Sequence, residues 1–168
     1  MTSPSDSGGR DQVFQIDLRS DDLVRSIGVG PLPLFITFGY GSAWVSCYRG
    51  GHVSVIRPGS ERPERVPVAA GPLGLAVGAG AVWVVSYWTQ ELSRIDPDTR
   101  RVVARISVGG GPLSVAVGAG AVWVTNRGDH SVTRIDPSTN KAVKTIKLDS
   151  SPQGIAVSGG RVWVTTQT

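Results

Sequence analysis

Cysteine, histidine and long apolar runs are scarce in this chain of 168 residues. The single cysteine, Cys47, excludes a disulfide within the chain, and its place after a Trp-Val-Ser segment predicts a small core or strand-end residue. No stretch approaches the roughly 18 apolar residues of a membrane span. The N-terminal residues lack the basic and apolar regions of a signal peptide. We therefore expect a cytoplasmic protein without a membrane partner, or an extracytoplasmic one if the chain is a fragment.

Neither sign of charge dominates the chain. It has 17 Lys and Arg against 13 Asp and Glu, a formal net charge of +4. The basic residues are scattered along the chain, for example at Arg105, Lys141 and Lys144, where a solvated rim explains them. A nucleic-acid interface would need a clustered basic stripe or interleaved aromatic residues on one face. We expect no nucleic-acid partner.

Tryptophan recurs at positions 44, 83, 123 and 163, with spacings of 39, 40 and 40 residues. The surrounding frame is also repeated, since residues 73–84 read LGLAVGAGAVWV and residues 113–124 read LSVAVGAGAVWV. A fixed period of about 40 residues indicates a repeat architecture.

Each repeat contains four short segments rich in Val, Ile, Thr and Trp, separated by Gly, Pro, Asp and Asn. This pattern predicts four antiparallel strands, a to d, and no helix. The first strand carries small residues such as Gly74 and Ala76, which suit strands that converge on an axis, while a tryptophan on the second strand can fill the wider gap farther out. We therefore predict an all-β propeller with the four repeated tryptophans in its core.

The two ends of the chain carry complementary halves of one repeat. Residues 12–30 align with strands c and d, and residues 152–168 align with strands a and b. Between them lie three whole units, 33–70, 72–109 and 112–149, and residues 1–11 are expected to form a disordered tail. The prediction is a single domain of four blades, the last one completed by the N-terminal and C-terminal strands, which removes exposed sheet edges. Two alternatives remain open: a ring closed by two chains, and an open arc of a larger propeller.

An Ile-Asp-Pro-x-Thr element stands between strands c and d at residues 95–99 and 135–139. A carboxylate before proline can accept hydrogen bonds from the backbone amides that follow, which predicts a turn. Calcium would need several convergent oxygens, and the first unit has Arg-Pro-Gly-Ser at 57–60, without the Asp. We expect no metal and no cofactor.

The frame P-x-G-[IL]-A-V-G-x-G-x-V-W-V-T-N, followed by V-x-R-I-D-P-x-T, resembles the repeats of YVTN or YncE-like propellers and those of streptogramin lyases. The match is clear over 72–108 and 112–148 and weaker over 33–68 and 152–165. Resemblance to the lyases would imply a magnesium-assisted elimination that opens a cyclic depsipeptide, with a Glu-x-His pair and a further His. No Glu-x-His occurs here, and the only histidines are His52 and His130. No catalytic residue can be carried over.

A candidate binding face follows from comparing the two most similar units. Residues 71–85 and 111–125 agree at 12 of 15 positions, whereas 86–92 and 126–132 agree at none of seven. The variable piece is the loop between strands b and c, which shares a face with the connections from strand d to the next strand a. The candidate ligand-binding residues gathered there, together with Asn126, are Tyr48, Arg49, His52, Tyr87, Trp88, Glu91, Arg127, Asp129 and His130.

Simpler explanations stand beside these candidates. The sequences of surface loops vary when little constrains them. Trp88 is either an exposed aromatic contact or a rim plug packed on its neighbour. Asp129 with His130 is either an oriented base or a polar hairpin tip. The leading hypothesis is a non-enzymatic module that binds a peptide, glycan or protein, as a monomer or a closed homodimer. A lyase would need His52, Glu91 and His130 to converge on a metal. A third possibility is a fragment of a larger sensor or extracytoplasmic propeller.

Overall fold

The computed structural model describes residues 11–168, and every regular element in that range is a β-strand. No helix in the described part is long and apolar enough to cross a membrane. The predicted tail, 1–11, lies outside the described residues except for Asp11. That residue is tied to the fold, because its carboxylate accepts a 2.7 Å hydrogen bond from the Leu32 amide.

Three four-stranded antiparallel sheets form the body of the chain, and we name them blades 1 to 3. Blade 1 consists of β3 (Pro33–Gly39), β4 (Ser42–Cys47), β5 (His52–Ile56) and β6 (Glu64–Pro67). Blade 2 consists of β7 (Pro72–Gly78), β8 (Ala81–Ser86), β9 (Glu91–Asp96) and β10 (Arg101–Ser107). Blade 3 consists of β11 (Pro112–Gly118), β12 (Ala121–Asn126), β13 (Ser131–Asp136) and β14 (Lys141–Lys147).

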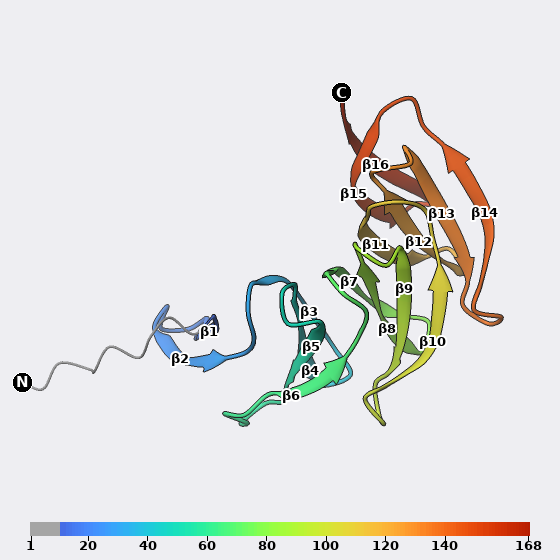
Figure 1. Cartoon of the computed structure of the whole chain (residues 1–168). Coiled ribbons are helices and arrows are strands. Elements are labelled where there is room, and N and C mark those ends of the chain that lie inside the picture. Colours follow the sequence, from blue (N-terminus) through green and yellow to red (C-terminus); the bar gives the residue numbers. More distant parts are fainter. Residues whose placement is uncertain (1–10) are drawn as a thin grey trace, which may run out of the picture.

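A two-stranded sheet stands at each end of the chain. The N-terminal half-blade is β1 (Gln12–Ile16) with β2 (Leu23–Gly28), and the C-terminal half-blade is β15 (Ser151–Ser158) with β16 (Arg161–Gln167). Strand a of each blade packs beside strand a of the next, as β3, β7, β11 and β15 do in turn. The blades therefore follow one another around a common inner side (Figure 1).

Strand register repeats from blade to blade. Trp83 lies opposite Arg94 in blade 2, and Trp123 lies opposite Arg134 in blade 3. Each guanidinium also covers the indole opposite it, at 5.3 Å and 5.7 Å from the ring centroid. The turns between strands a and b contain residues in the left-handed backbone conformation, including Ala79 at φ 49°. The equivalent Ala119, in the second Gly-Ala-Gly turn, has φ 51°.

The predicted use of small and large residues between blades is confirmed for the interior of the chain. A Cβ added to Gly74 would lie 2.7 Å from the carbonyl oxygen of Leu113 on the next blade, so the inner strands nearly touch. Trp83 is fully buried in one cluster with Val122 and Val124 of that blade, and its indole N–H donates to the Gly78 carbonyl at 3.0 Å. The indoles thus fill the space between blades.

The turn chemistry predicted for the Ile-Asp-Pro-x-Thr elements is also confirmed. Asp96 Oδ1 accepts from the amides of Asp98 and Thr99 and from the Thr99 hydroxyl, at 2.7–3.1 Å. These bonds, first of all the one from the Thr99 amide, lower the pKa of Asp96 from its ordinary value. In the other element, the hydroxyl and amide of Ser138 lower the pKa of Asp136.

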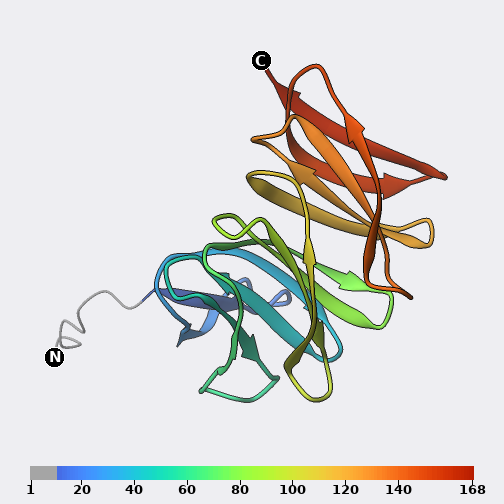
Figure 2. The same cartoon turned by 45° about the vertical axis from the view of Figure 1, so that its right-hand side comes forward.

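The prediction of a ring closed within one chain is wrong. The two half-blades are separate two-stranded sheets, and β16 pairs only with β15 among the described strands. Both views place β1 and β2 at one end of an open arc and β15 and β16 at the other (Figures 1 and 2). From one half-blade to the other, the four repeats therefore span only part of a circle. The structure has the open-arc form instead.

The open arc changes the environment of the last repeated tryptophan. Trp44 and Trp83 are buried and Trp123 is half-buried, but 60% of Trp163 is exposed. The core position predicted for Trp163 is therefore wrong in the single chain, because none of the described blades covers this ring.

Candidate functional site

The loops between strands b and c and the connections from strand d to the next strand a lie on one face of the arc. Backbone hydrogen bonds of 2.9 Å join them, from the amides of Tyr48, Tyr87 and Arg127 to the carbonyls of Leu32, Gly71 and Gly111. We call this surface the b–c face. Each blade presents a variable turn there on a sheet of constant register, as the sequence predicts.

Three aromatic residues from two blades meet on the b–c face. Trp88 lies edge-on to Tyr87, with ring centroids 4.9 Å apart, and 6.4 Å from Tyr48 of blade 1. Trp88 nevertheless remains 65% exposed. Both interpretations of Trp88 thus hold in part, since one edge of the indole packs on its neighbours while the rest faces solvent. We call Tyr48, Tyr87 and Trp88 the aromatic cluster.

Glycine at position 71 makes room for this cluster. Gly71 has φ +73°, and a Cβ on it would lie 2.5 Å from Trp88 Cδ1 and 3.3 Å from a ring carbon of Tyr48. The left-handed backbone favours glycine, and the close approach of the indole requires it. The indole of Trp88 therefore packs against the connection from blade 1 to blade 2 at Gly71.

Polar candidates flank the cluster on neighbouring turns. Arg49 and Arg127 are exposed in the b–c turns of blades 1 and 3. The carboxylate of Asp129 accepts a 2.6 Å hydrogen bond from the Gly110 amide, so it holds the blade 2 to blade 3 connection. His130 follows it in an exposed turn at φ 48°. Asp129 and His130 thus lie at the tip of a polar hairpin.

Three other candidates are used inside the blades. His52 is buried, with Nδ1 3.0 Å from the Gly50 carbonyl, and its ring fills the space beside Gly30 and Gly50. Glu91 Oε1 pairs with Arg105 at 2.7 Å and accepts from the Ser93 hydroxyl at 2.9 Å. Asn126, also buried, donates to the hydroxyls of Ser131 and Thr133.

Cys47 is buried at the end of β4, 3.5 Å from the Ser54 hydroxyl. Burial raises the pKa of its thiol, which disfavours the thiolate that a nucleophile needs. The prediction of a core or strand-end residue is confirmed. Within residues 11–168 no group of three or more His, Cys, Asp or Glu is placed to hold a metal ion.

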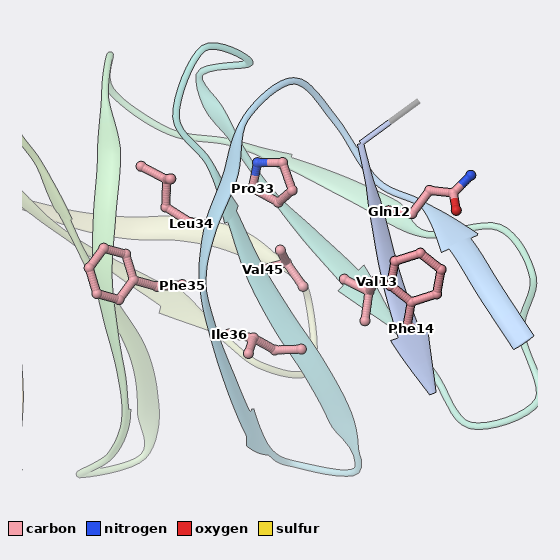
Figure 3. Close-up of a pocket in the computed structure, with 8 residues that line it drawn as sticks. All are labelled: Gln12, Val13, Phe14, Pro33, Leu34, Phe35, Ile36 and Val45. Atoms are coloured by element: carbon pink, nitrogen blue, oxygen red, sulfur yellow. The ribbon is translucent and has the colours of Figure 1, made fainter. Parts of the chain in front are cut away.

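Sequence reasoning missed an apolar groove at the N-terminal end of the arc. It lies between β1 and β3 and has a volume of about 270 Å³. Figure 3 shows Val13 and Phe14 on one side and the β3–β4 side chains Ile36 and Val45 facing them. We call it the terminal groove. The predicted closed ring would have covered it, although the alternating Leu34, Ile36 and Phe38 could have indicated an apolar face on β3.

Comparison with known proteins identifies the fold. No protein-family description matches the chain, and no curated protein does. Among solved structures, a streptogramin B lyase has 22% identity and a TM-score of 0.83, covering 93% of this chain and 55% of its own. A catalytically inactive virginiamycin B lyase from Staphylococcus aureus with quinupristin has 21% identity and a TM-score of 0.80, covering 92% and 56%.

A computationally designed protein named Ika8 has 14% identity and a TM-score of 0.77, covering 94% of this chain and 50% of its own. With the sheets described above, these similarities show that the chain is an all-β propeller of four-stranded antiparallel blades. The solved structures it resembles include streptogramin B lyase-like propellers. The chain spans only 50–56% of the length of these three proteins.

Proposed function

We propose that this chain is a non-enzymatic module that binds a protein partner through the b–c face. The observation that carries the proposal is the aromatic cluster, in which Trp88 is exposed but held in place by Tyr48, Tyr87 and Gly71. A fixed aromatic ring loses little conformational entropy when a partner covers it. Trp, Tyr and Arg are also the residues most enriched where protein interfaces concentrate their binding energy.

The surroundings of the cluster indicate the chemistry of the partner. Arg49 and Arg127 are exposed on the two neighbouring turns, and arginine pairs with carboxylates in a two-pronged geometry. An apolar side chain with acidic residues beside it would satisfy both the indole and the guanidinium groups. We therefore expect a protein or peptide segment of that composition as the ligand.

Selection from a displayed random-peptide library tests this proposal. Peptides that bind the wild-type chain should lose affinity about 30-fold on Trp88→Ala, since truncation of such a residue costs about 2 kcal/mol or more. Tyr40→Ala is the matched control, because Tyr40 is also exposed but belongs to a turn between strands a and b, on the opposite face. Selected peptides that bind Trp88→Ala as well as wild type would contradict the proposal.

A lyase remains the second candidate because the chain resembles streptogramin B lyase structures. The residues such an activity would need come from three different blades: His52 from blade 1, Glu91 from blade 2 and His130 from the b–c turn of blade 3. His52 is buried and Glu91 is paired with Arg105, which weighs against a shared metal. Incubation with quinupristin and magnesium, followed by mass spectrometry, separates the two. We expect intact quinupristin, and conversion above a no-protein control would favour the lyase.

We also infer that the repeats are of the YVTN or YncE-like kind. Support comes from the frame shared by residues 72–108 and 112–148 and from the register that places each Val-Trp-Val segment on strand b. An alignment of related sequences would test it by showing whether that frame recurs in propellers of this kind.

A further inference from the structure

Both ends of the arc expose apolar side chains that the other repeats bury. On strand d, Ile27, Val66 and Ile106 are buried, but Ile146, the equivalent residue of blade 3, is 37% exposed. On strand a, Leu73 of blade 2 is buried, whereas 48% of the equivalent Leu34 is exposed. In the single chain, each half-blade therefore covers only part of the neighbouring face of blade 3 or blade 1.

The two half-blades are complementary in their strands. The N-terminal half-blade supplies strands c and d, and the C-terminal half-blade supplies strands a and b. We propose that two copies of this chain assemble so that the N-terminal half-blade of each completes the C-terminal half-blade of the other. Each copy has three whole blades and contributes to two shared ones, which gives a closed ring of eight blades, within the usual range.

The register of the whole blades defines the shared blade. In blade 3, Trp123 lies opposite Arg134 and Thr125 lies opposite Val132. The same register places Trp163 opposite Gln15 and Thr165 opposite Val13 of the second copy. Both strands are available for this pairing, because β16 bonds only to β15 and β1 only to β2 among the described strands.

The terminal groove suits Trp163 of a second copy. In blade 1, the indole of Trp44 shares a core cluster with Leu75, Val84 and other side chains of blade 2. The positions equivalent to Leu75 and Val84 on blade 1 are Ile36 and Val45, which line the terminal groove (Figure 3). Completing the shared blade would thus bring Trp163 over the groove. Trp44 and Trp83 face the blade that follows them in the same way.

Charges at the two ends are also complementary. Between blades 1 and 2, Glu64 of strand d pairs with Arg100 of the next c–d turn at 2.6 Å. At the junction between blade 3 and the shared blade, the equivalent of Glu64 is Lys144 on strand d of blade 3. The equivalent of Arg100 is Asp21 in the c–d turn that the second copy supplies. These two residues form the same pair with the signs exchanged. Asp21 also has the left-handed turn conformation of Arg100, with φ 58° against 56°.

Arginine adds a second interaction at the same junction. Arg94 of blade 2 donates to the Asn140 side chain in the c–d turn of blade 3, at 2.9 Å. The residue equivalent to Arg94 on blade 3 is Arg134, and the one equivalent to Asn140 is Asp21 of the second copy. Two cations, Arg134 and Lys144, would therefore converge on one carboxylate.

The shape of the arc favours a second copy as the occupant. More than 90% of this chain matches the streptogramin B lyase and designed-protein structures, with TM-scores of 0.77–0.83. The matched part makes up only 50–56% of each of those chains. Its curvature is therefore that of about half such a structure. A second identical arc would supply the other half and cover both unpartnered ends at once by a two-fold arrangement.

Light scattering on the purified chain is the first test. At about 50 µM, above the micromolar dissociation constants of weak interfaces, we expect twice the 17.6 kDa mass of one chain. A single-chain mass would overturn the proposal. So would a series of ever larger masses, which an open, non-closing contact produces.

Truncation of a junction residue is the second test. Trp163→Ala should weaken the dimer at least about tenfold, because the side chain is lost at both junctions. Trp88→Ala is the matched control: its indole is equally exposed but lies on the b–c face, and the dimer should be unchanged. Equal effects of the two variants would count against this interface without bearing on partner binding.

Charge exchange and cross-linking test the register. Lys144→Glu should weaken the dimer about tenfold over two junctions, and Asp21→Lys in the same chain should recover only part of that loss, because Arg134 also faces the new lysine. Val13→Cys with Thr165→Cys should give a covalent dimer on oxidation, since directly opposite residues have the spacing a disulfide needs. Phe14→Cys with Thr165→Cys puts the thiols on opposite faces and should stay uncrosslinked. A failed rescue together with no cross-link would refute this pairing.

Discussion

Blade 2 and the C-terminal half-blade carry the same Val-Trp-Val segment on strand b, in very different surroundings. Trp83 is fully buried between blades 2 and 3, whereas Trp163 is mostly exposed beyond the last blade. Local structure is the same at both sites, since Trp83 lies opposite Ala76 and Trp163 opposite Ala156 in equivalent hairpins. The blade that follows, and not the repeat itself, decides whether the indole contributes to the core.

Truncation of the two tryptophans should give the largest contrast. Trp83→Ala removes an indole that packs in a core cluster and donates to Gly78, so we expect a loss of about 3–5 kcal/mol in unfolding free energy. Trp163→Ala should cost less than about 1 kcal/mol in the single chain, as surface changes do. Urea unfolding measures both, at a concentration where light scattering gives one chain. Equal losses would mean that Trp163 is covered in the monomer.

Filling the inner strand should give the next contrast. A Cβ at Gly74 would press on backbone atoms of Leu113 and Ser114, at 2.7 and 2.9 Å, and neither can turn away. We expect Gly74→Ala to destabilise the fold by about 1–3 kcal/mol. At the equivalent Gly154, the added Cβ would meet only the Thr165 hydroxyl, at 3.2 Å. Gly154→Ala should leave the urea midpoint nearly unchanged, and a comparable loss would contradict the difference in packing.

The smallest contrast concerns the c–d turns. Asp96 accepts two amides and a hydroxyl, and its pKa is lowered from the ordinary 3.8. A carboxylate with a lowered pKa stabilises the fold at neutral pH and loses this effect as the pH falls from about 5 to about 2. Asp96→Asn should therefore lower the urea midpoint at pH 7 and change it little at pH 2.5.

Asp17 is the comparison for that experiment, since Oδ1 accepts only the amides of Arg19 and Ser20 in the N-terminal half-blade. Asp17→Asn should shift the midpoint at pH 7 by less than Asp96→Asn does. A larger shift for Asp17→Asn would show that the terminal turn matters more to the fold than the interior one.

Strands, turns and the spacing between blades could be predicted because each depends on residues close together in one repeat. The Gly-Ala-Gly turns and the carboxylate of Asp96 determine local backbone geometry, and the frame around Trp83 specifies which face is buried. Ring closure could not be predicted in this way. Ring closure depends on the rotation between neighbouring sheets, which many side-chain contacts determine together. No single residue in the sequence indicates that rotation.

The candidate site shows the same limit. Variation between repeats predicted that the candidate residues share the b–c face, and it left Trp88 open between an exposed contact and a rim plug. The burial of His52 was not predicted, because it depends on Gly30, which is distant in sequence and comes from the connection into blade 1. Similarly, the contact between Gly71 and Trp88 joins the connection that precedes blade 2 to the b–c turn of the same blade. Contacts between separate loops carry no periodic signal.

The alanines in the two Gly-Ala-Gly turns have a practical consequence. Ala79 and Ala119 hold φ angles near 50°, where a methyl group costs on the order of 1 kcal/mol relative to glycine. Glycine would relieve that strain, with part of the gain offset by its greater freedom in the unfolded chain. These two hairpins are thus natural starting points for engineering a more heat-resistant variant, and they lie on the side away from the aromatic cluster.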